Sequence, residues 1–178
     1  LYFRICTIIV WTAGVISAQN LVPNPNFESY SSCPTSISQL PLAVPWITPT
    51  VATPDYFHVC TGSISVDVPS NFGGGGYQFP LTGDAYAGAF FKGFDTYREY
   101  IQVQLATPLE VGKCYNVGFF MNLMNQYCGI KQAGIYISAV APSSTGNMLL
   151  PVEPQIEGSG GYYSDTVAWV EIAGLYAA

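Results

Sequence analysis

Side chains that can bind a sugar recur at every second position from Arg98 to Gln104. An aromatic ring can stack on the C–H face of a sugar, and an amide or guanidinium group can bond to its hydroxyl groups. A second run, from Asn116 to Asn122, supplies more side chains of these types. The alternative is a solvated sheet face covered by a loop, which would use Gln and Asn equally well. The candidate ligand-binding residues are Arg98, Tyr100, Gln102, Gln104, Asn116, Phe120, Asn122, Tyr162 and Tyr163.

Four aromatic residues lie in or beside glycine-rich segments, namely Tyr77, Phe79, Tyr162 and Tyr163. Loops carry a large share of binding residues because they run over the protein surface. These rings could form a platform for a ligand, or they could fold back as lids on the core. The sequence leaves both interpretations open.

The sequence assigns no catalytic residues. An enzyme needs an acid/base pair, or a nucleophile with its base. Asp55 and His58 lie close together, but their spacing matches no known catalytic triad, so we expect His58 to be a packed structural residue. Asp84 and Glu99 would form a glycosidase pair only if the fold held them at a catalytic separation. A glycoside hydrolase-like enzyme is therefore kept as an alternative.

Glu99 shares the parity of Ile101 and Val103 in the alternating run 97–105. Alternate side chains of a strand point to the same face, so this parity predicts that Glu99 is partly buried. The simplest explanation for a buried carboxylate here is an ion pair with Lys113 or Arg98.

Four cysteines follow the first 18 residues, at Cys33, Cys60, Cys114 and Cys128. In an exported chain, four cysteines imply up to two disulfides with three connectivities. We favour Cys33 with Cys60 and Cys114 with Cys128, because each of these pairs closes a local loop. A zinc site is a weak alternative, because the sequence has no C-x-x-C pair and only one histidine, His58.

The composition indicates a single all-β domain. The 178 residues are 49% hydrophobic and 15% aromatic but only 9% charged, whereas ordinary soluble domains are roughly 25% charged. Helix surfaces usually carry many charged residues, and the 18 glycines and 13 prolines indicate many turns. The net charge of -6, without a cluster of Lys or Arg, argues against a nucleic-acid partner.

Residues 1–18 differ in kind from the rest of the chain. One arginine precedes an apolar run, and small residues follow at 16–18, which is typical of a secretory signal peptide cleaved after Ala18. A membrane anchor is the alternative, but the run is shorter than the ~20 residues of a spanning helix. We therefore expect an extracytoplasmic chain, secreted or at the cell surface or outer envelope, with no transmembrane span in its mature part.

Period-two alternation predicts strands along the mature chain, and no segment shows a convincing helical period. We expect the runs 97–105 and 115–123 to pair as a hairpin-like unit. The side chains expected to face the core are Ile101, Val103, Leu105, Val117, Phe119 and Met121. Strands separated by turns and long crossings indicate an antiparallel β-sandwich, most simply a jelly roll. We expect residues 19–178 to be one such domain that lacks its last strand or strands. The other expected strands are 64–68, 82–91, 132–140, 152–156 and 166–176.

Five runs together resemble one known family: NLVPNPNFE at 20–28, SCPTS at 32–36, TPDYFHVC at 53–60, GDAYAGAFF at 83–91 and YREYIQVQLATPLEVGKCYNVGFFMNL at 97–123. They are similar to the carbohydrate-binding-module-like (galactose-binding-like) jelly-roll N-terminal domain of Bacteroidetes-type surface and outer-envelope proteins. The resemblance implies a β-sandwich in an extracytoplasmic location. It also implies that Glu28 could help to hold a structural calcium ion, as the matching strand does in similar modules.

These observations predict a non-catalytic exported cell-surface module that binds glycan or another envelope polymer. A structural or adhesion module whose partner is a surface protein is the main alternative. No cofactor is expected beyond the structural calcium, and the oligomeric state is left open.

Overall fold

The fold is built from short antiparallel strands joined by long irregular segments. The computed structural model describes residues 19–93, 95–158 and 160–178, so the predicted signal peptide lies outside the described residues. No helix in this described part is long and apolar enough to cross a membrane. The elements, in order, are η1 (Leu40–Leu42), β1 (Asp55–His58), β2 (Ser70–Asn71), η2 (Phe72–Gly74), β3 (Gly76–Tyr77), β4 (Ala85–Gly88), β5 (Cys114–Met121), β6 (Gly134–Ile135), β7 (Ile156–Glu157) and β8 (Val170–Ala177).

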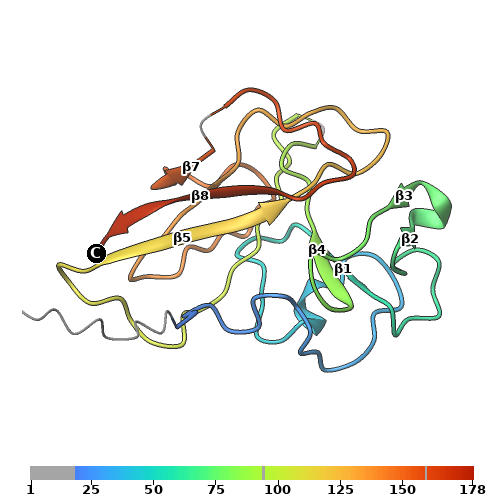
Figure 1. The fold of residues 1–178 in the computed structure, drawn as a ribbon, viewed down its shortest axis with the longest axis horizontal. Coiled ribbons are helices and arrows are strands. Elements are labelled where there is room, and N and C mark those ends of the chain that lie inside the picture. The colour runs from blue at the N-terminus through green and yellow to red at the C-terminus, as the bar shows by residue number, and fades with distance from the viewer. Residues whose placement is uncertain (1–18, 94, 159) are drawn as a thin grey trace, which may run out of the picture.

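The longest sheet is a two-stranded ribbon of β5 and β8, which pair antiparallel over their full lengths. Figure 1 shows this ribbon running from the C-terminus to the middle of the molecule, while β2 and β3 lie on the opposite side of the molecule. The predicted parity of β5 is confirmed, because Val117, Phe119 and Met121 turn inward while Asn116 and Phe120 are exposed. Met121 packs with two other buried side chains, Ala133 and Ile172.

The predicted pairing of 97–105 with 115–123 is wrong. In the described structure 97–105 joins no ladder and makes a single bridge, between Gln102 and Ile47. The backbone nitrogen of each of these two residues donates to the carbonyl oxygen of the other, at 2.8 and 2.9 Å. A period of two shows which face of a strand is buried, but it does not identify the neighbouring strand. β8 offers a full-length partner for β5, whereas 97–105 meets the proline-rich irregular chain around Ile47.

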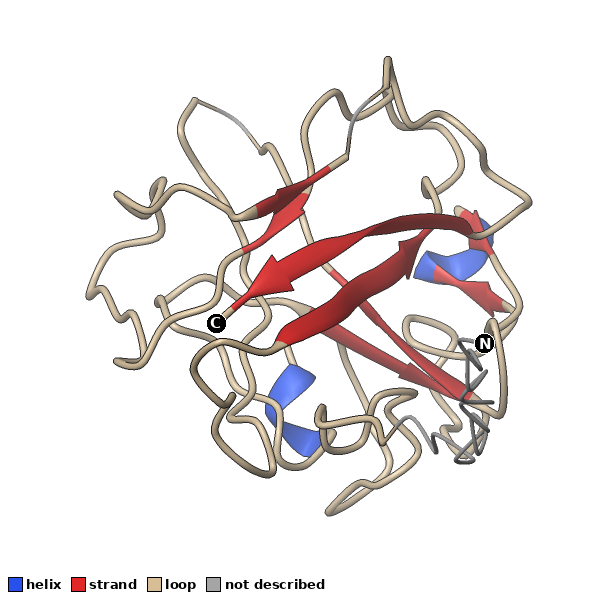
Figure 2. Ribbon diagram, turned by 60° about the vertical axis from the view of Figure 1, so that its left-hand side comes forward, coloured by secondary structure: helices blue, strands red, loops and turns tan. Residues whose placement is uncertain are grey.

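The second sheet pairs β1 with β4, and Figure 2 shows both strands beside the β5–β8 ribbon. All four residues of β1 are buried. Tyr56 packs against Ala43 and Ala85 on one side, and Phe57 packs with Val66 on the other. This buried strand therefore joins two hydrophobic clusters.

The remaining predicted strands are shorter than expected or absent. Residues 64–66 form a turn and none of 64–68 lies in a strand, so the strand predicted there is wrong. Of 82–91 only Ala85–Gly88 is a strand, and of 132–140 only Gly134–Ile135, which pairs with Ile156–Glu157. The final predicted strand corresponds to β8. The fold class is all-β, as predicted, with its described strands in four two-stranded antiparallel sheets.

Cys33 and Cys60 form a disulfide, as predicted, across a sequence separation of 27 residues. The predicted Cys114–Cys128 pair is wrong, because both thiols are free and exposed. Cys114 is the first residue of β5, and the strand carries the chain away from it for eight residues. A strand rises about 3.3 Å per residue, whereas disulfide-bonded Cα atoms lie within about 7 Å. Closeness in sequence therefore did not mean closeness in space.

Candidate functional site

The 97–105 segment uses several of its predicted ligand-binding groups within the fold. The Tyr100 hydroxyl accepts a hydrogen bond from the backbone nitrogen of Leu150 at 3.0 Å. The Arg98 guanidinium donates to the carbonyl oxygen of Tyr97 at 2.8 Å. The amide oxygen of Gln102 is buried and has no partner among the described residues. Gln104 is exposed.

The predicted residues of the second run lie on or just beyond β5. Asn116 and Phe120 occupy its exposed face, where they stand opposite Leu175 and Glu171 of β8. The Asn122 amide donates to the carbonyl oxygen of Asp165 at 3.4 Å. Because β5 pairs with β8, the structure does not form the expected two-strand ligand face from 97–105 and 115–123.

The two adjacent tyrosines separate into different environments. Tyr162 is 69% exposed. Tyr163 is half-buried and packs on the cluster of Met121, Ala133 and Ile172, and its backbone bridges to Ile130. Tyr163 therefore contributes to the core, while Tyr162 points into solvent.

Tyr77 and Phe79 are the loop aromatics that the structure brings together. They are 56% and 60% exposed, and their ring centroids lie 5.6 Å apart with the ring planes at 89°. The two rings form one corner of a hollow of about 240 Å³, which we call the Tyr77–Phe79 hollow. Its lining residues are Tyr77, Gln78, Phe79, Asn125, Thr166 and Val167.

Hydrogen bonds from distant segments hold the backbone of this corner. β3 ends at Tyr77, whose backbone nitrogen donates to the Asn125 side-chain oxygen at 3.0 Å. The indole nitrogen of Trp169 donates to the carbonyl oxygen of Phe79 at 2.9 Å. The Gln78 amide nitrogen donates to that same carbonyl and, at 3.3 Å, to Val167. The two rings are thus positioned by the segments around residues 125 and 167–169.

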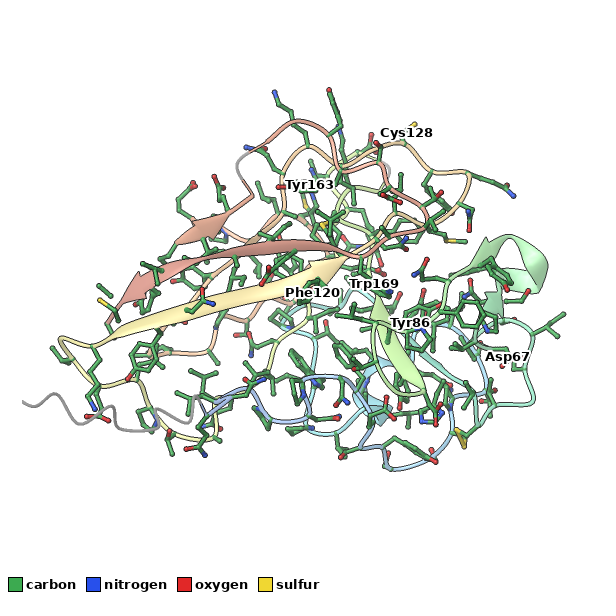
Figure 3. All side chains as sticks on the ribbon, in the orientation of Figure 1. Asp67, Tyr86, Phe120, Cys128, Tyr163 and Trp169 are labelled. Atoms are coloured by element: carbon green, nitrogen blue, oxygen red, sulfur yellow. A yellow bond between two sulfur atoms is a disulfide. The ribbon has the colours of Figure 1, made fainter. Side chains whose placement is uncertain are left out.

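Trp169, which bonds to the Phe79 carbonyl, belongs to an aromatic stack, and Figure 3 shows its labelled members Trp169 and Tyr86 side by side. The Tyr86 ring meets Trp169 edge to face at 5.8 Å and stacks on Phe57 at 4.9 Å. Its hydroxyl accepts a hydrogen bond from the Asn71 amide at 2.7 Å. Burial raises the pKa of the Tyr86 phenol, which therefore stays neutral. This stack links the hollow to the buried strand β1.

The polar groups of the hollow are neutral. The Gln78 amide oxygen, the Asn125 amide nitrogen and the Thr166 hydroxyl have no hydrogen-bond partner among the residues that the structure describes. None of the six lining residues is Asp, Glu, Lys, Arg or His. The arrangement can stack on an apolar face and bond to hydroxyl groups, and its lining offers no acid/base pair.

The sequence singled out Tyr77 and Phe79 as loop aromatics, but it did not indicate which segments would complete their site. Asn125 and Thr166 lie far from Tyr77 along the chain, and no local pattern connects them to it. Only the packing of β8 beside β5 places the 165–169 segment next to the 77–79 segment.

A second hollow of about 460 Å³ lies near the start of the described chain. It carries a charged pair, Lys113 and Glu110, whose side chains are 2.8 Å apart. Its single aromatic residue, Tyr115, accepts a hydrogen bond from the backbone nitrogen of Glu110 at 2.8 Å. This hollow therefore lacks the pair of exposed rings found in the Tyr77–Phe79 hollow, and the hydroxyl of its one ring is already bonded to Glu110. Its lining residues are Gln19, Leu21, Thr107, Pro108, Glu110, Lys113 and Tyr115.

Glu99 is buried, as predicted, but its expected ion pair is wrong. Its two carboxylate oxygens each accept a hydrogen bond at 2.7 Å, one from the backbone nitrogen of Phe90 and one from the Tyr97 hydroxyl. Lys113 instead pairs with Glu110. The buried carboxylate is therefore stabilised by neutral donors.

Asp55 is a second buried carboxyl group close to Glu99. Burial raises the pKa of Asp55 to about 6, a hydrogen bond from the backbone nitrogen of Ser38 opposes this rise, and the negative charge of Glu99 adds to it. Neither acid lines either of the two hollows. Asp84, the other acid considered for a glycosidase pair, is exposed. Its backbone nitrogen donates a hydrogen bond to the Glu28 carboxylate at 2.8 Å.

The other predicted site residues have structural contacts. Glu28 fixes the turn before β4 through that bond to Asp84. The described residues contain no group of three or more His, Cys, Asp or Glu side chains that could hold a metal ion, so the calcium expected at Glu28 stays a prediction. His58 is buried, as predicted, and accepts a hydrogen bond from the backbone nitrogen of Cys60 at 2.9 Å.

Comparisons with known proteins identify no relative. A scan against protein-family models finds no match. Searches of the curated proteins and of the solved structures find no similar protein either.

Proposed function

We propose that this protein is a non-catalytic exported module that binds a glycan or another cell-envelope polymer. The observation that carries the proposal is the Tyr77–Phe79 hollow, where two exposed rings meet at a right angle beside free amide and hydroxyl groups. Aromatic rings provide apolar stacking surfaces, and neutral polar groups provide hydrogen bonds to hydroxyl groups.

Two further observations support an extracytoplasmic binding module. The Cys33–Cys60 disulfide suits an oxidising compartment, where such bonds form and persist. The all-β fold is compatible with the jelly-roll sandwich that the five sequence runs resemble. The jelly roll and the location at the cell surface or outer envelope belong to the proposal.

The test is a binding assay with insoluble polymers, namely cellulose, chitin and peptidoglycan sacculi, together with a glycan array. We expect the purified chain to bind at least one of them. Tyr77→Ala and Phe79→Ala should each weaken that binding by roughly tenfold, since an anchoring ring contributes 1 kcal/mol or more. Tyr136→Ala, which removes another exposed tyrosine, is the matched control and should bind normally. Absence of binding to every polymer would end the proposal.

A second candidate function, adhesion to a surface protein, is favoured by the outward face of the β5–β8 ribbon. Leu175 is 78% exposed and Phe120 is 45% exposed on this face, with Gly118 and Ala173 between them. If this face binds a protein, Leu175→Lys should abolish capture of that partner and leave polymer binding unchanged. Polymer binding that depends on Tyr77 would favour the first function.

A further inference from the structure

We infer that the Tyr77–Phe79 hollow selects uncharged sugar units, so that the ligand is a neutral glycan and not an acidic polysaccharide. This inference rests on the proposed function and names the ligand class of the same site. It follows from the charge, the ring geometry and the free polar groups of the lining.

Charge excludes acidic sugars from the hollow. A uronate, sulfate or sialate group is recognised through Arg or Lys, which supply charge-assisted hydrogen bonds. None of the six lining residues is Lys or Arg, and the whole chain has only five such residues against eleven acids. An anionic polymer would therefore meet no local cation and a protein with a net charge of -6.

The two rings can contact one sugar unit from two sides. With ring planes at 89° and centroids 5.6 Å apart, one ring can stack on a sugar face while the other contacts its edge. The volume of about 240 Å³ lies below the ~300–1,000 Å³ of typical small-molecule sites, so it fits a short segment of a chain. Both Tyr77 and Phe79 are more than half exposed, so a unit inside a polymer can reach them.

The free polar groups match hydroxyl groups, which both donate and accept. The Gln78 amide oxygen can accept a hydrogen bond, the Asn125 amide nitrogen can donate one, and the Thr166 hydroxyl can do both. The other atoms of these two amides are already engaged with the backbone of Tyr77, Phe79 and Val167, which fixes their orientation. These groups are thus held in place before a ligand arrives.

A quaternary ammonium ion is the other ligand class that binds aromatic faces. Such ions are usually enclosed by an aromatic cage, and a nearby carboxylate would add to their binding. The hollow has only two rings, and its lining residues include no carboxylate. The Asp165 carboxylate beside it already accepts hydrogen bonds from the backbone nitrogens of Val167 and Ala168. Because a quaternary ammonium ion forms no hydrogen bonds, it would also leave the amide and hydroxyl groups of Gln78, Asn125 and Thr166 without partners. The lining therefore favours a sugar.

The experiment is native affinity electrophoresis of the full chain in gels that contain one polysaccharide each. The neutral polymers are galactomannan, xyloglucan and hydroxyethylcellulose, and the anionic polymers are polygalacturonate and alginate. Tyr77→Ala, Phe79→Ala and the control Tyr136→Ala are run beside the parent chain, and thermal unfolding confirms that each variant is folded. The gels are repeated with tetramethylammonium chloride and with sodium chloride at equal concentration.

We expect retardation in at least one neutral gel. It should be lost in Tyr77→Ala and Phe79→Ala, kept in Tyr136→Ala and equal in the two salts. Retardation only in anionic gels would overturn the inference while the proposed glycan-binding function stands. Retardation in a neutral gel that survives both ring substitutions, or that tetramethylammonium selectively abolishes, would also overturn it. Absence of retardation in every gel would overturn the inference and count against the proposed function as well.

Discussion

The indole nitrogen of Trp169 donates a hydrogen bond of 2.9 Å to the carbonyl oxygen of Phe79, across 90 residues of sequence. Trp169 lies just before β8, and Phe79 lies just after β3. The bond ties the exposed aromatic corner to the longest sheet of the protein. The position of the Phe79 ring therefore depends on β8 being in place.

Replacing Trp169 with Phe should weaken ligand binding with only a modest effect on stability. The substitution keeps an aromatic ring against Tyr86 but removes the donor to Phe79, at a cost of about 1 kcal/mol. We expect binding to the responsive polymer to fall by roughly fivefold, because the Phe79 carbonyl keeps only one of its two donors, the Gln78 amide. Isothermal titration and urea unfolding measure the two effects.

Trp46→Phe is the matched control for that variant. The Trp46 indole also donates to a backbone carbonyl, that of Asn24 at 2.8 Å, but it packs in another cluster that includes Tyr56. It should cost a similar free energy of unfolding and leave binding unchanged. Equal losses of binding in both variants would mean that Trp169 has no specific positioning role.

Gly76→Ala should disturb the hollow, because Gly76 directly precedes Tyr77 in β3. A Cβ at residue 76 would overlap the side-chain oxygen of Asn71, whose amide nitrogen supports Tyr86. We expect a loss of about 1–3 kcal/mol in the free energy of unfolding, together with weaker binding. Gly62→Ala is the control, because a Cβ there meets nothing within 4 Å. Differential scanning fluorimetry of the two variants should therefore show a lower Tm for Gly76→Ala alone.

Asp55 should make the protein less stable as the pH rises. Its pKa is raised from 3.8 to about 6 in the folded chain, so the folded state retains a proton that the unfolded state has released. Stability from this group is complete below the unfolded pKa and is lost as the pH passes through about 6, by on the order of 3 kcal/mol.

Asp55→Asn keeps an oxygen that can accept the bond from the Ser38 nitrogen but cannot ionise. The variant should therefore gain stability relative to the parent chain between pH 4 and pH 7.5. Urea unfolding at several pH values measures this difference. Stability curves that stay parallel over this range would contradict the expected titration.

Substituting the disulfide cysteines should destabilise the protein, whereas substituting the free cysteines should not. Replacing Cys33 and Cys60 together by Ala removes a disulfide with a sequence separation of 27, which should cost about 3–4 kcal/mol. Replacing the exposed Cys114 and Cys128 by Ser should change stability by less than about 0.5 kcal/mol.

Alkylation of the folded chain followed by peptide mapping gives a second measurement. Cys114 and Cys128 should be labelled without a reductant, while Cys33 and Cys60 should be protected. Protection of Cys114 and Cys128 before reduction would indicate that these two cysteines form a disulfide, contrary to the structure.

Local sequence patterns predicted the side-chain directions better than the strand partners. The alternation along β5 correctly placed Val117 and Met121 inward and Phe120 outward. The same alternation in 97–105 correctly buried Glu99, yet that segment forms no ladder in the described structure. A hydrophobic period reports on burial, and many segments can satisfy the same burial with different neighbours.

The sequence by itself determined the all-β class and the buried face of β5, and it favoured the Cys33–Cys60 disulfide. These depend on composition, on a period of two and on closeness along the chain, which act over a short range of sequence. Only the tertiary structure decided that β5 pairs with β8, that Cys114 and Cys128 stay apart, and that Asn125 and Thr166 complete a hollow with Tyr77. Those features join segments far apart along the chain, so they depend on long-range packing that no local pattern encodes.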